Sequence, residues 1–293
     1  SSAKLLSAEI ATGLRGRSLD REVFPFSFNE YLEHHAIEVR RTRIGSKTRL
    51  LLDQQAECYC RQGGLPELQG LAPVRAREVA QSYVDAVVLR DVVERHGVSN
   101  VEALRALLYK VLREPATKFS IHKVYQDFKS RGLRVSKDDL YAFMRYLTDA
   151  YLLFQLPLWT RSEKKRQVNP KKVYAIDNGI LEAYSTQMTA DHGALLENLV
   201  YVTLRRRVRE LGYYETRQGY EVDFAYREAD QTILVQVAWS LQNEQTRNRE
   251  IRALREAGKE LKNCQKQIVT LNEEATLDDG DIKVLPLWQV LGV

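Results

Sequence analysis

Three oxygen-bearing side chains in the C-terminal third have the types and the spacing to hold a hard metal ion. Glu197 lies in a helical pattern, Asp223 in a run of alternating apolar residues, and Gln236 in the next such run. A phosphodiesterase site needs two or three oxygen ligands on a divalent cation, beside a group that positions the nucleophile. The order of these residues therefore has the layout of a metal-dependent hydrolytic centre.

The residue that would position the nucleophile is missing. This order of residues resembles the restriction-endonuclease-like nucleases, which carry an acid followed two positions later by lysine where this chain has Gln236-Val-Ala238. Gln236 still offers a carbonyl oxygen, but Ala238 offers nothing to a nucleophile. We therefore expect a degenerate nuclease scaffold, at which Glu197, Asp223 and Gln236 bind a divalent cation only weakly.

The elements that would carry these residues follow from periodicity. Residues 221–227 and 233–239 alternate apolar and polar side chains around a polar turn, which predicts two strands of one hairpin. Leu196, Val200 and Leu204 repeat at helical spacing, so we expect Glu197 to face the hairpin from a packed helix. Further strands are expected at 212–215, 267–271 and near 283–285, with helices from 184 and over 245–262. The sequence thus predicts a restriction-endonuclease-like mixed sheet flanked by helices over residues 179–293.

Residues 101–178 have the pattern of a winged helix-turn-helix. Three compact helices are predicted at 101–112, 121–130 and 137–150, followed by strands at 151–157 and 172–177. The third helix, which in such modules reads the groove, begins Lys137-Asp-Asp139, and two carboxylates there oppose contact with DNA. We therefore expect any DNA contact to be led by the wing, where basic residues gather.

Two basic clusters are the candidate nucleic-acid surface. The first lies in the predicted wing and the second at the end of the predicted helix that carries Glu197. Their members are Arg161, Lys164, Lys165, Arg166, Lys171 and Lys172, and Arg205, Arg206, Arg207 and Arg209. A net charge of +5 and a pI near 9.0 fit a duplex DNA partner but give only a small excess of positive charge.

The first hundred residues are predicted to be mainly helical. A short strand should precede a helix capped by Ser27 and Glu30, and two or three helices should follow, broken at Gly63-Gly-Leu-Pro66. No run of about eighteen apolar residues and no signal-peptide layout occurs, which predicts a cytoplasmic protein without a membrane partner. The three cysteines complete no zinc site and are expected to be reduced and structural.

Seven stretches, in this order, resemble the prokaryotic AAA-type ATPases that carry a C-terminal restriction-endonuclease-like domain of unknown function. They are SSAKLLS (1–7), LRGRSL (14–19), FPFSFNEYL (24–32), GGLPE (63–67), KKVYAIDNG (171–179), ENLV (197–200) and EVDF (221–224). The resemblance covers nearly the whole chain. It implies a remnant of the ATPase core and its helical lid over residues 1–100.

The resemblance also implies roles for the first residues. Ser1 and Ser2 would be the end of the strand that senses the nucleotide γ-phosphate, and Arg15 or Arg17 would be an arginine finger. No Gly-x-x-x-x-Gly-Lys-Ser/Thr motif occurs, so we expect this chain to bind no ATP by itself and to be a truncated form of an intact protein that uses ATP and Mg²⁺. Asp177, which follows a strand, is expected to cap the next helix rather than to bind metal.

Three functions remain open from the sequence. The first is a non-catalytic, targeting part of an AAA-type ATPase that engages DNA or a protein partner. The second is a divalent-metal nuclease in which Lys164, Lys172 or an arginine between Arg205 and Arg209 replaces the missing lysine. The third is a pure interaction or self-association module, favoured by the acidic start of the third helix.

Overall fold

The computed structural model describes residues 22–39, 44–185, 192–277 and 280–292. Ser1, Ser2, Arg15 and Arg17, for which the sequence predicts nucleotide-related roles, lie outside the described residues. The described part combines helices with a three-stranded and a six-stranded sheet, which confirms the predicted α/β class at this level. No helix in it is long and apolar enough to cross a membrane.

The N-terminal part is helical, as predicted. Ser27 and Glu30 form a capping box at the start of the first described helix. The short strand expected before this helix does not form, and the Phe26 N–H instead donates a single hydrogen bond of 2.7 Å to the Gly64 carbonyl. The elements are α2 (Phe28–His34), α3 (Ser46–Gln62), η1 (Pro66–Leu68), α4 (Pro73–Val87) and η2 (Val88–Glu94).

The middle part contains the three expected helices and both expected strands. Ser136 and Asp139 form a second capping box at the start of α7. The elements are α5 (Val101–Arg113), β1 (Lys118–Phe119), α6 (Ile121–Ser130), α7 (Lys137–Asp149), β2 (Leu153–Leu156), α8 (Glu163–Val168) and β3 (Lys171–Ala175). The strands pair antiparallel in the order β1-β3-β2. Strand β1 and helix α8 were not predicted, because elements of two and six residues are too short to show a periodic pattern.

The C-terminal part is built on the six-stranded mixed sheet, in the order β4-β5-β6-β7-β9-β8. Strands β6, β7 and β9 run parallel and their neighbours antiparallel. The elements are α9 (Asn178–Tyr184), α10 (His192–Arg205), β4 (Leu211–Glu215), β5 (Glu221–Glu228), β6 (Gln231–Val237), α11 (Glu244–Glu260), β7 (Cys264–Thr270), β8 (Ala275–Leu277), β9 (Ile282–Pro286) and α12 (Leu287–Val290). The predicted hairpin and flanking helices are confirmed, whereas β8 was not expected.

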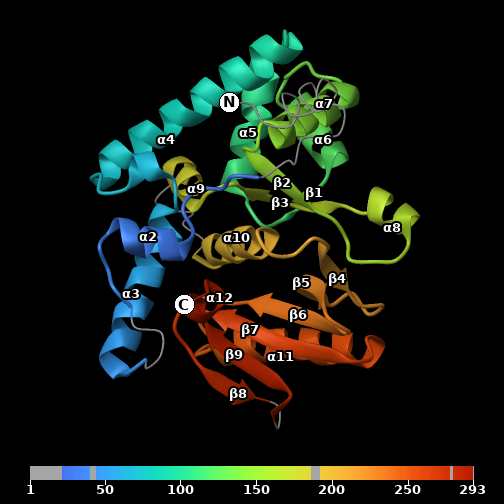
Figure 1. Cartoon of the computed structure of the whole chain (residues 1–293). Helices are drawn as coiled ribbons and strands as arrows, with labels where there is room; N and C mark the ends of the chain where they lie inside the picture. Colours follow the sequence, from blue (N-terminus) through green and yellow to red (C-terminus); the bar gives the residue numbers. More distant parts are fainter. Residues whose placement is uncertain (1–21, 40–43, 186–191, 278–279, 293) are drawn as a thin grey trace, which may run out of the picture.

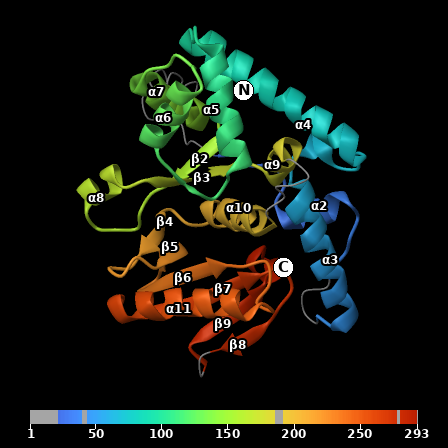
Figure 2. The same cartoon turned by 180° about the vertical axis from the view of Figure 1, so that it is seen from behind.

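Alternation along β6 explains how the sheet is covered on both faces. Ile233 and Val235 point to the α10 side, and Leu234 points to the α11 side, where it packs with Leu254. Helix α10 lies between the six-stranded sheet and the three-stranded sheet, and α11 covers the opposite face of the six-stranded sheet (Figures 1 and 2). Helix α10 contacts both β3 and β6 and so connects the two sheets, and contacts of α12 with α3 and of β2 with β4 also join the two halves of the molecule.

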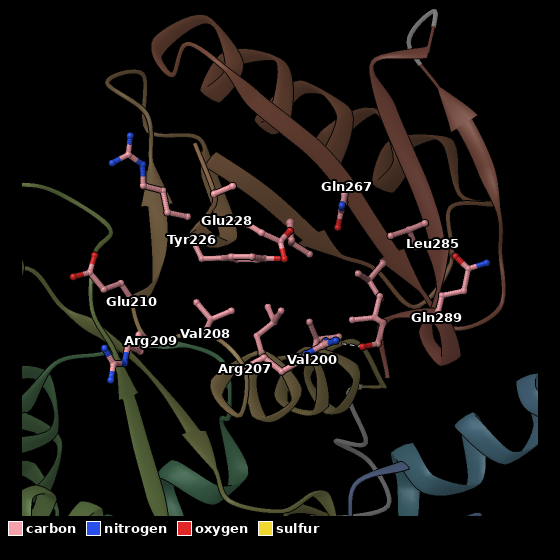
Figure 3. Close-up of a pocket in the computed structure, with 16 residues that line it drawn as sticks. Val200, Arg207, Val208, Arg209, Glu210, Tyr226, Glu228, Gln267, Leu285 and Gln289 are labelled. Atoms are coloured by element: carbon pink, nitrogen blue, oxygen red, sulfur yellow. Dashed lines mark hydrogen bonds between the residues drawn. The ribbon is translucent and has the colours of Figure 1, made fainter. Parts of the chain in front are cut away.

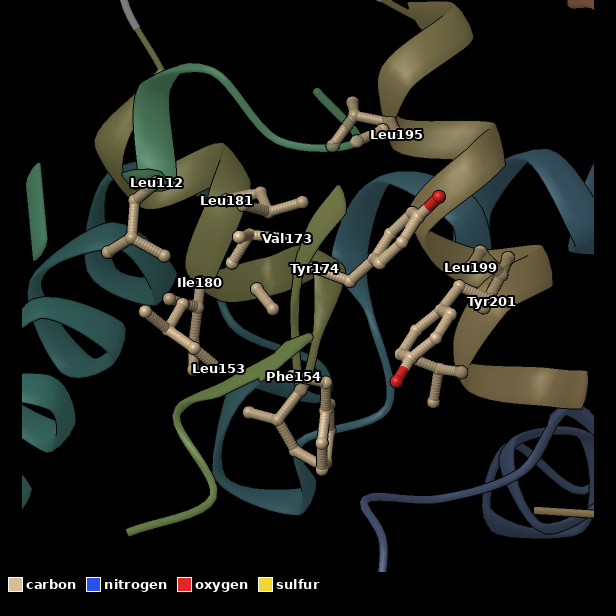
Figure 4. Close-up of a cluster of buried hydrophobic side chains, with 14 of the residues drawn as sticks. Leu112, Leu153, Phe154, Val173, Tyr174, Ile180, Leu181, Leu195, Leu199 and Tyr201 are labelled. Atoms are coloured by element: carbon tan, nitrogen blue, oxygen red, sulfur yellow. The ribbon is translucent and has the colours of Figure 1, made fainter. Parts of the chain in front are cut away.

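An aromatic pair marks this junction. Tyr174 of β3 and Tyr201 of α10 stack with ring centroids 4.1 Å apart, and Phe154 of β2 lies against Tyr201 (Figure 4). These rings belong to one continuous apolar core that extends from α2 to α12. Strand β3 is therefore held firmly against α10, and this contact fixes the residues next to Tyr174.

Candidate functional site

Three acidic side chains surround the ammonium group of Lys172. Glu197 comes from α10, Glu221 and Asp223 come from β5, and the lysine comes from β3. The Lys172 Nζ lies 2.6 Å from Glu197 Oε1, 3.0 Å from Glu221 Oε1 and 3.1 Å from Asp223 Oδ1. We call these four residues the acid cluster. The structure thus brings together Glu197 and Asp223, adds Glu221, and places beside them Lys172, one of the residues named as a replacement for the missing lysine.

Burial makes the charges of the acid cluster depend on one another. The Lys172 side chain is 3% exposed, and those of Glu197 and Asp223 are 14% exposed. Burial by itself lowers the pKa of Lys172, but the carboxylates of Asp223, Glu197 and Glu221 outweigh it and raise that pKa, so the lysine stays charged. Burial raises the pKa of Glu197, and Asp223 raises it further, against the opposing effect of Lys172. The pKa of Glu197 is raised to about 8 even beside Lys172, so Glu197 is the acid of the cluster that most readily holds a proton at neutral pH.

Further donors contact the carboxylates of the acid cluster. The Tyr174 hydroxyl donates to Glu197 Oε1 at 2.7 Å, and the Val237 N–H donates to Asp223 Oδ2 at 2.9 Å. Lys118, at the edge of the cluster, lies 2.7 Å from Glu221 Oε2 and also contacts Glu215. The cluster is closed by protein donors on several sides.

Gln236 does not face the cation position. Its Oε1 accepts the Asp223 N–H at 2.7 Å, and its Nε2 donates to the Glu221 carbonyl and to Glu250 Oε2, at 3.1 and 2.7 Å. Glu250, on α11, is 4% exposed and also pairs with Arg249. Gln236 is therefore a structural link between β5 and α11, and the expectation that its carbonyl serves as a metal ligand does not fit this geometry.

A divalent cation does not fit the acid cluster as the side chains stand. The ammonium group already contacts one oxygen of each of the three carboxylates, at the distances given above. Among the residues that the structure describes, no group of three or more His, Cys, Asp or Glu side chains is arranged to hold a metal ion. The expected cation site is thus filled by a side chain of the same chain.

The predicted basic clusters divide into exposed and internal residues. Arg161, Lys164 and Lys165 are exposed, on or next to α8 at the tip of the β2–β3 hairpin. Arg166 is half-buried and donates to the Thr160 carbonyl at 3.2 Å, and Lys171 is also half-buried. Lys172 is buried in the acid cluster, so we remove it from the predicted DNA surface.

The arginines at and after the end of α10 mostly contact other parts of the chain rather than forming an open basic cluster. Arg205 pairs with Glu22 at 2.7 Å, Arg206 donates to the Pro25 carbonyl at 2.8 Å, and Arg207 donates to the Val290 carbonyl at 2.6 Å. Helix α10 ends at Arg205, so the helical surface expected for all four residues is wrong. Only Arg209 is without such a contact among the described residues.

A cavity of about 440 Å³ lies beside α8 and includes residues from both halves of the molecule. Three cations line it, Lys165 from α8, Arg217 from the β4–β5 turn and Lys259 from α11, together with two acids, Glu215 and Glu260, and the rings of Trp159 and Tyr214. Lys259 also pairs with Glu256 at 2.6 Å. Glu260 accepts hydrogen bonds from the Tyr214 hydroxyl and the Arg217 N–H, both at 2.8 Å. We call these residues and the exposed part of α8 the basic cavity. The sequence did not reveal Arg217 and Lys259 as members of this site, because their segments are distant from Lys165 along the chain and come together only in the folded protein.

A larger groove of about 730 Å³ separates the end of α10 from the six-stranded sheet (Figure 3). Val200 and Val208 line one side and Tyr226 and Leu285 the other. Three arginines and two glutamates lie around it: Arg207, Arg209, Arg227, Glu210 and Glu228. One of these arginines, Arg207, is engaged with the Val290 carbonyl, so two arginines and two glutamates remain around the groove.

The acidic start of α7 has a structural explanation. Asp139 accepts hydrogen bonds from the Ser136 hydroxyl and N–H, at 2.7 and 3.2 Å, and so completes the capping box. The ammonium group of Lys137 lies 5.4 Å from the centre of the Tyr125 ring. Asp177, similarly, caps α9 by accepting the Gly179 N–H at 2.8 Å, as predicted.

Comparison with known proteins divides the chain in two. A model of the domain of unknown function DUF8612 matches residues 53–191, and a model of the domain of unknown function DUF4143 matches residues 192–290. Lys172 thus belongs to the first match and its three carboxylate partners to the second. The acid cluster therefore lies at the contact between the two matched domains.

Two relatives are themselves of unknown function. The uncharacterized protein MJ1544 of Methanocaldococcus jannaschii is 35% identical over 301 residues, which cover 99% of this chain and 67% of that protein. An uncharacterized protein of Haemophilus influenzae is 26% identical over 243 residues, 82% of this chain and 58% of that protein. The chain belongs to the same protein family as MJ1544.

Proposed function

We propose that this chain is a non-catalytic, targeting part of an AAA-type ATPase and that it engages duplex DNA through the basic cavity. The observation that carries the proposal is the convergence of Lys165, Arg217 and Lys259 on one cavity, next to exposed Arg161 and Lys164. Lys165 and Arg217 form no ion pair among the described residues, whereas Lys259 pairs with Glu256. Lysine and arginine side chains without carboxylate partners are the groups that neutralise phosphates. Trp159 and Tyr214 add aromatic surface between them.

The arrangement of the middle part supports this role. The order α5-β1-α6-α7-β2-β3, with the sheet order β1-β3-β2, agrees with a winged helix-turn-helix in which the β2–β3 hairpin is the wing. Because Asp139 is engaged in capping α7, the wing is the better candidate for contact with DNA. The basic cavity extends this contact to the C-terminal sheet.

The link to an ATPase rests on the resemblance and on the relatives. DUF4143 domains are commonly found with AAA ATPase domains. The chain spans 67% and 58% of the two relatives, so a further part of such a protein would have room for a nucleotide-binding core. ATP and Mg²⁺ would then be used by that part, and the described residues would select its target.

Fluorescence anisotropy of a short duplex, repeated over a salt series, tests the proposal. We expect affinity to fall steeply with salt, with a slope that reports several phosphate contacts. The variant Lys164→Ala/Lys165→Ala/Arg217→Ala should reduce that slope by about one for each phosphate that is no longer neutralised. Lys283→Ala is the matched control, because Lys283 is exposed on β9, toward the opposite edge of the sheet.

Two results would count against DNA targeting. If the wild type binds no duplex at low salt, the alternative of a protein-interaction module takes its place. If the triple variant and Lys283→Ala change the slope equally, DNA binds elsewhere on the chain.

A second candidate function is a divalent-metal nuclease with a migrated lysine. It is favoured by one observation, the placement of Lys172 within 3.1 Å of Asp223 and 2.6 Å of Glu197. It requires the Lys172 ammonium group to move aside when the metal ion binds. Cleavage of supercoiled plasmid in Mn²⁺, lost in Glu197→Ala, would support this function. Absence of cleavage by the wild type would remove it.

A further inference from the structure

We infer that Lys172 is a built-in cation that occupies the place of a divalent metal ion and closes the acid cluster to metal in the folded chain. The inference concerns the contact between the two matched domains and is independent of DNA binding. It starts from a disagreement, because the order of acids predicts a metal centre whereas the folded side chains leave no position for one.

The geometry of the ammonium group matches the three carboxylates. Lysine has three N–H donors and no acceptor, and one carboxylate oxygen lies within 3.1 Å for each of them. A compact ammonium group is also the side chain closest in charge and size to a bound ion. The oxygens that would otherwise point at a metal therefore point at the Lys172 Nζ.

The position of the backbone prevents the lysine from being displaced easily. Lys172 lies in β3, where it is in register with Lys118 of β1 and Leu156 of β2. Two residues later, Tyr174 stacks on Tyr201 and donates to Glu197, and next to it the Ala175 N–H donates to Asn198 Oδ1 at 2.8 Å. The strand that carries the lysine is thus attached to the helix that carries Glu197.

Two lysines differ in this respect. Lys118 contacts Glu221 from the edge, and its side chain is 33% exposed, compared with 3% for Lys172. Water can replace the contact of Lys118, whereas the Lys172 side chain is almost entirely enclosed by protein. Only Lys172 is placed to exclude a metal ion.

Titration of Mn²⁺ into the full chain, followed by the electron paramagnetic resonance of free Mn²⁺, tests the inference. The measured quantity is the difference in bound Mn²⁺ between the wild type and Glu197→Gln. The Mn²⁺ concentration is raised to roughly the millimolar range, in which weak oxygen sites bind. We expect no difference, because Lys172 already occupies the position. A site in the wild type that disappears in Glu197→Gln would overturn the inference.

Removal of the lysine charge supplies the complementary test. Lys172→Met should gain one Mn²⁺ site at least about tenfold tighter than any in the wild type, since the number of ligand charges tunes affinity over decades. The site should be lost in Lys172→Met/Glu197→Gln, while Lys171→Met should behave as the wild type. A folded Lys172→Met that gains no site would contradict the inference, and if it does not fold, the comparison of wild type with Glu197→Gln still decides.

Discussion

The acid cluster and the basic cavity use charge in opposite ways. In the acid cluster a buried lysine faces three carboxylates, each with a donor from the same chain. In the basic cavity, Lys165 and Arg217 lie at a surface where no ion pair to either is formed by the described residues. If the acid cluster is closed by its own lysine, as we infer, its charges are satisfied within the chain, and the region that looks catalytic in the sequence has a structural role.

The largest expected effect comes from removing the central cation. Lys172→Met leaves the largely buried Glu197 and Asp223 and the partly exposed Glu221 without their common partner, which should lower the free energy of unfolding by about 3–5 kcal/mol. Urea denaturation followed by circular dichroism measures it. Lys171→Met, one residue earlier on the same strand, should cost far less, and equal losses would show that the acid cluster is not the cause.

Asp177 is a buried acid that forms no ion pair among the described residues, unlike the acids of the acid cluster. Burial raises the pKa of Asp177 to about 7, against hydrogen bonds from the Gly64 and Gly179 N–H groups. Because the folded pKa lies above the unfolded value, stability from this group is complete below about pH 4 and is lost as pH rises through 7. The loss is roughly 1.4 kcal/mol for each unit between the two pKa values.

The variant Asp177→Asn separates this contribution from other titrations. The difference in free energy of unfolding between wild type and variant should shrink as the pH rises from about 4 to 7. A difference that stays constant over this interval, measured by urea denaturation at several pH values, would show that Asp177 has an ordinary pKa.

The exposed lysine at the edge of the acid cluster should matter much less than the central one. Lys118 and Glu221 have side chains that are 33% and 31% exposed, and pairs of this kind contribute about 0–1 kcal/mol. Lys118→Met should therefore lower the free energy of unfolding by no more than about 1 kcal/mol. A loss as large as that of Lys172→Met would mean that burial does not distinguish the two lysines.

The smallest effect on stability is expected in the basic cavity. Lys165→Ala/Arg217→Ala should change the free energy of unfolding by about 0.5 kcal/mol or less, because both side chains lie at the surface. The same variant should weaken DNA binding in the salt series. Destabilisation without a change in DNA affinity would reverse the assignment of the two regions.

Local patterns predicted most elements but not the pairing of distant side chains. The hairpin of β5 and β6, helix α10 and the capping box at Ser27 follow from periodicity and capping residues. Glu197 and Asp223 were identified from their order. Lys172 was assigned to the wing and was also one of several candidates for the missing lysine, because nothing in a run of basic residues reveals which of them turns inward along β3.

The remaining misses have the same physical origin. Glu221 stands two residues before Asp223 on a strand, a spacing that places both side chains on one face, and this signal could have added it to the site. Arg217 and Lys259 join Lys165 only through the tertiary fold. The arginines after α10 resembled a basic surface because their backbone acceptors, such as those of Pro25 and Val290, are far away in sequence.

A double-mutant cycle on Lys172 and Glu197 tests most directly whether the acid cluster is closed by its own lysine. The free energies of unfolding of wild type, Lys172→Met, Glu197→Gln and the double variant would be measured by urea denaturation without divalent cations. We expect the double variant to lose less free energy of unfolding than the two single variants lose together, by about 1–3 kcal/mol. The reason is that the double variant leaves fewer charged groups of the acid cluster without a partner than Lys172→Met does. Additive losses would contradict this expectation, since Glu197 would then be independent of Lys172.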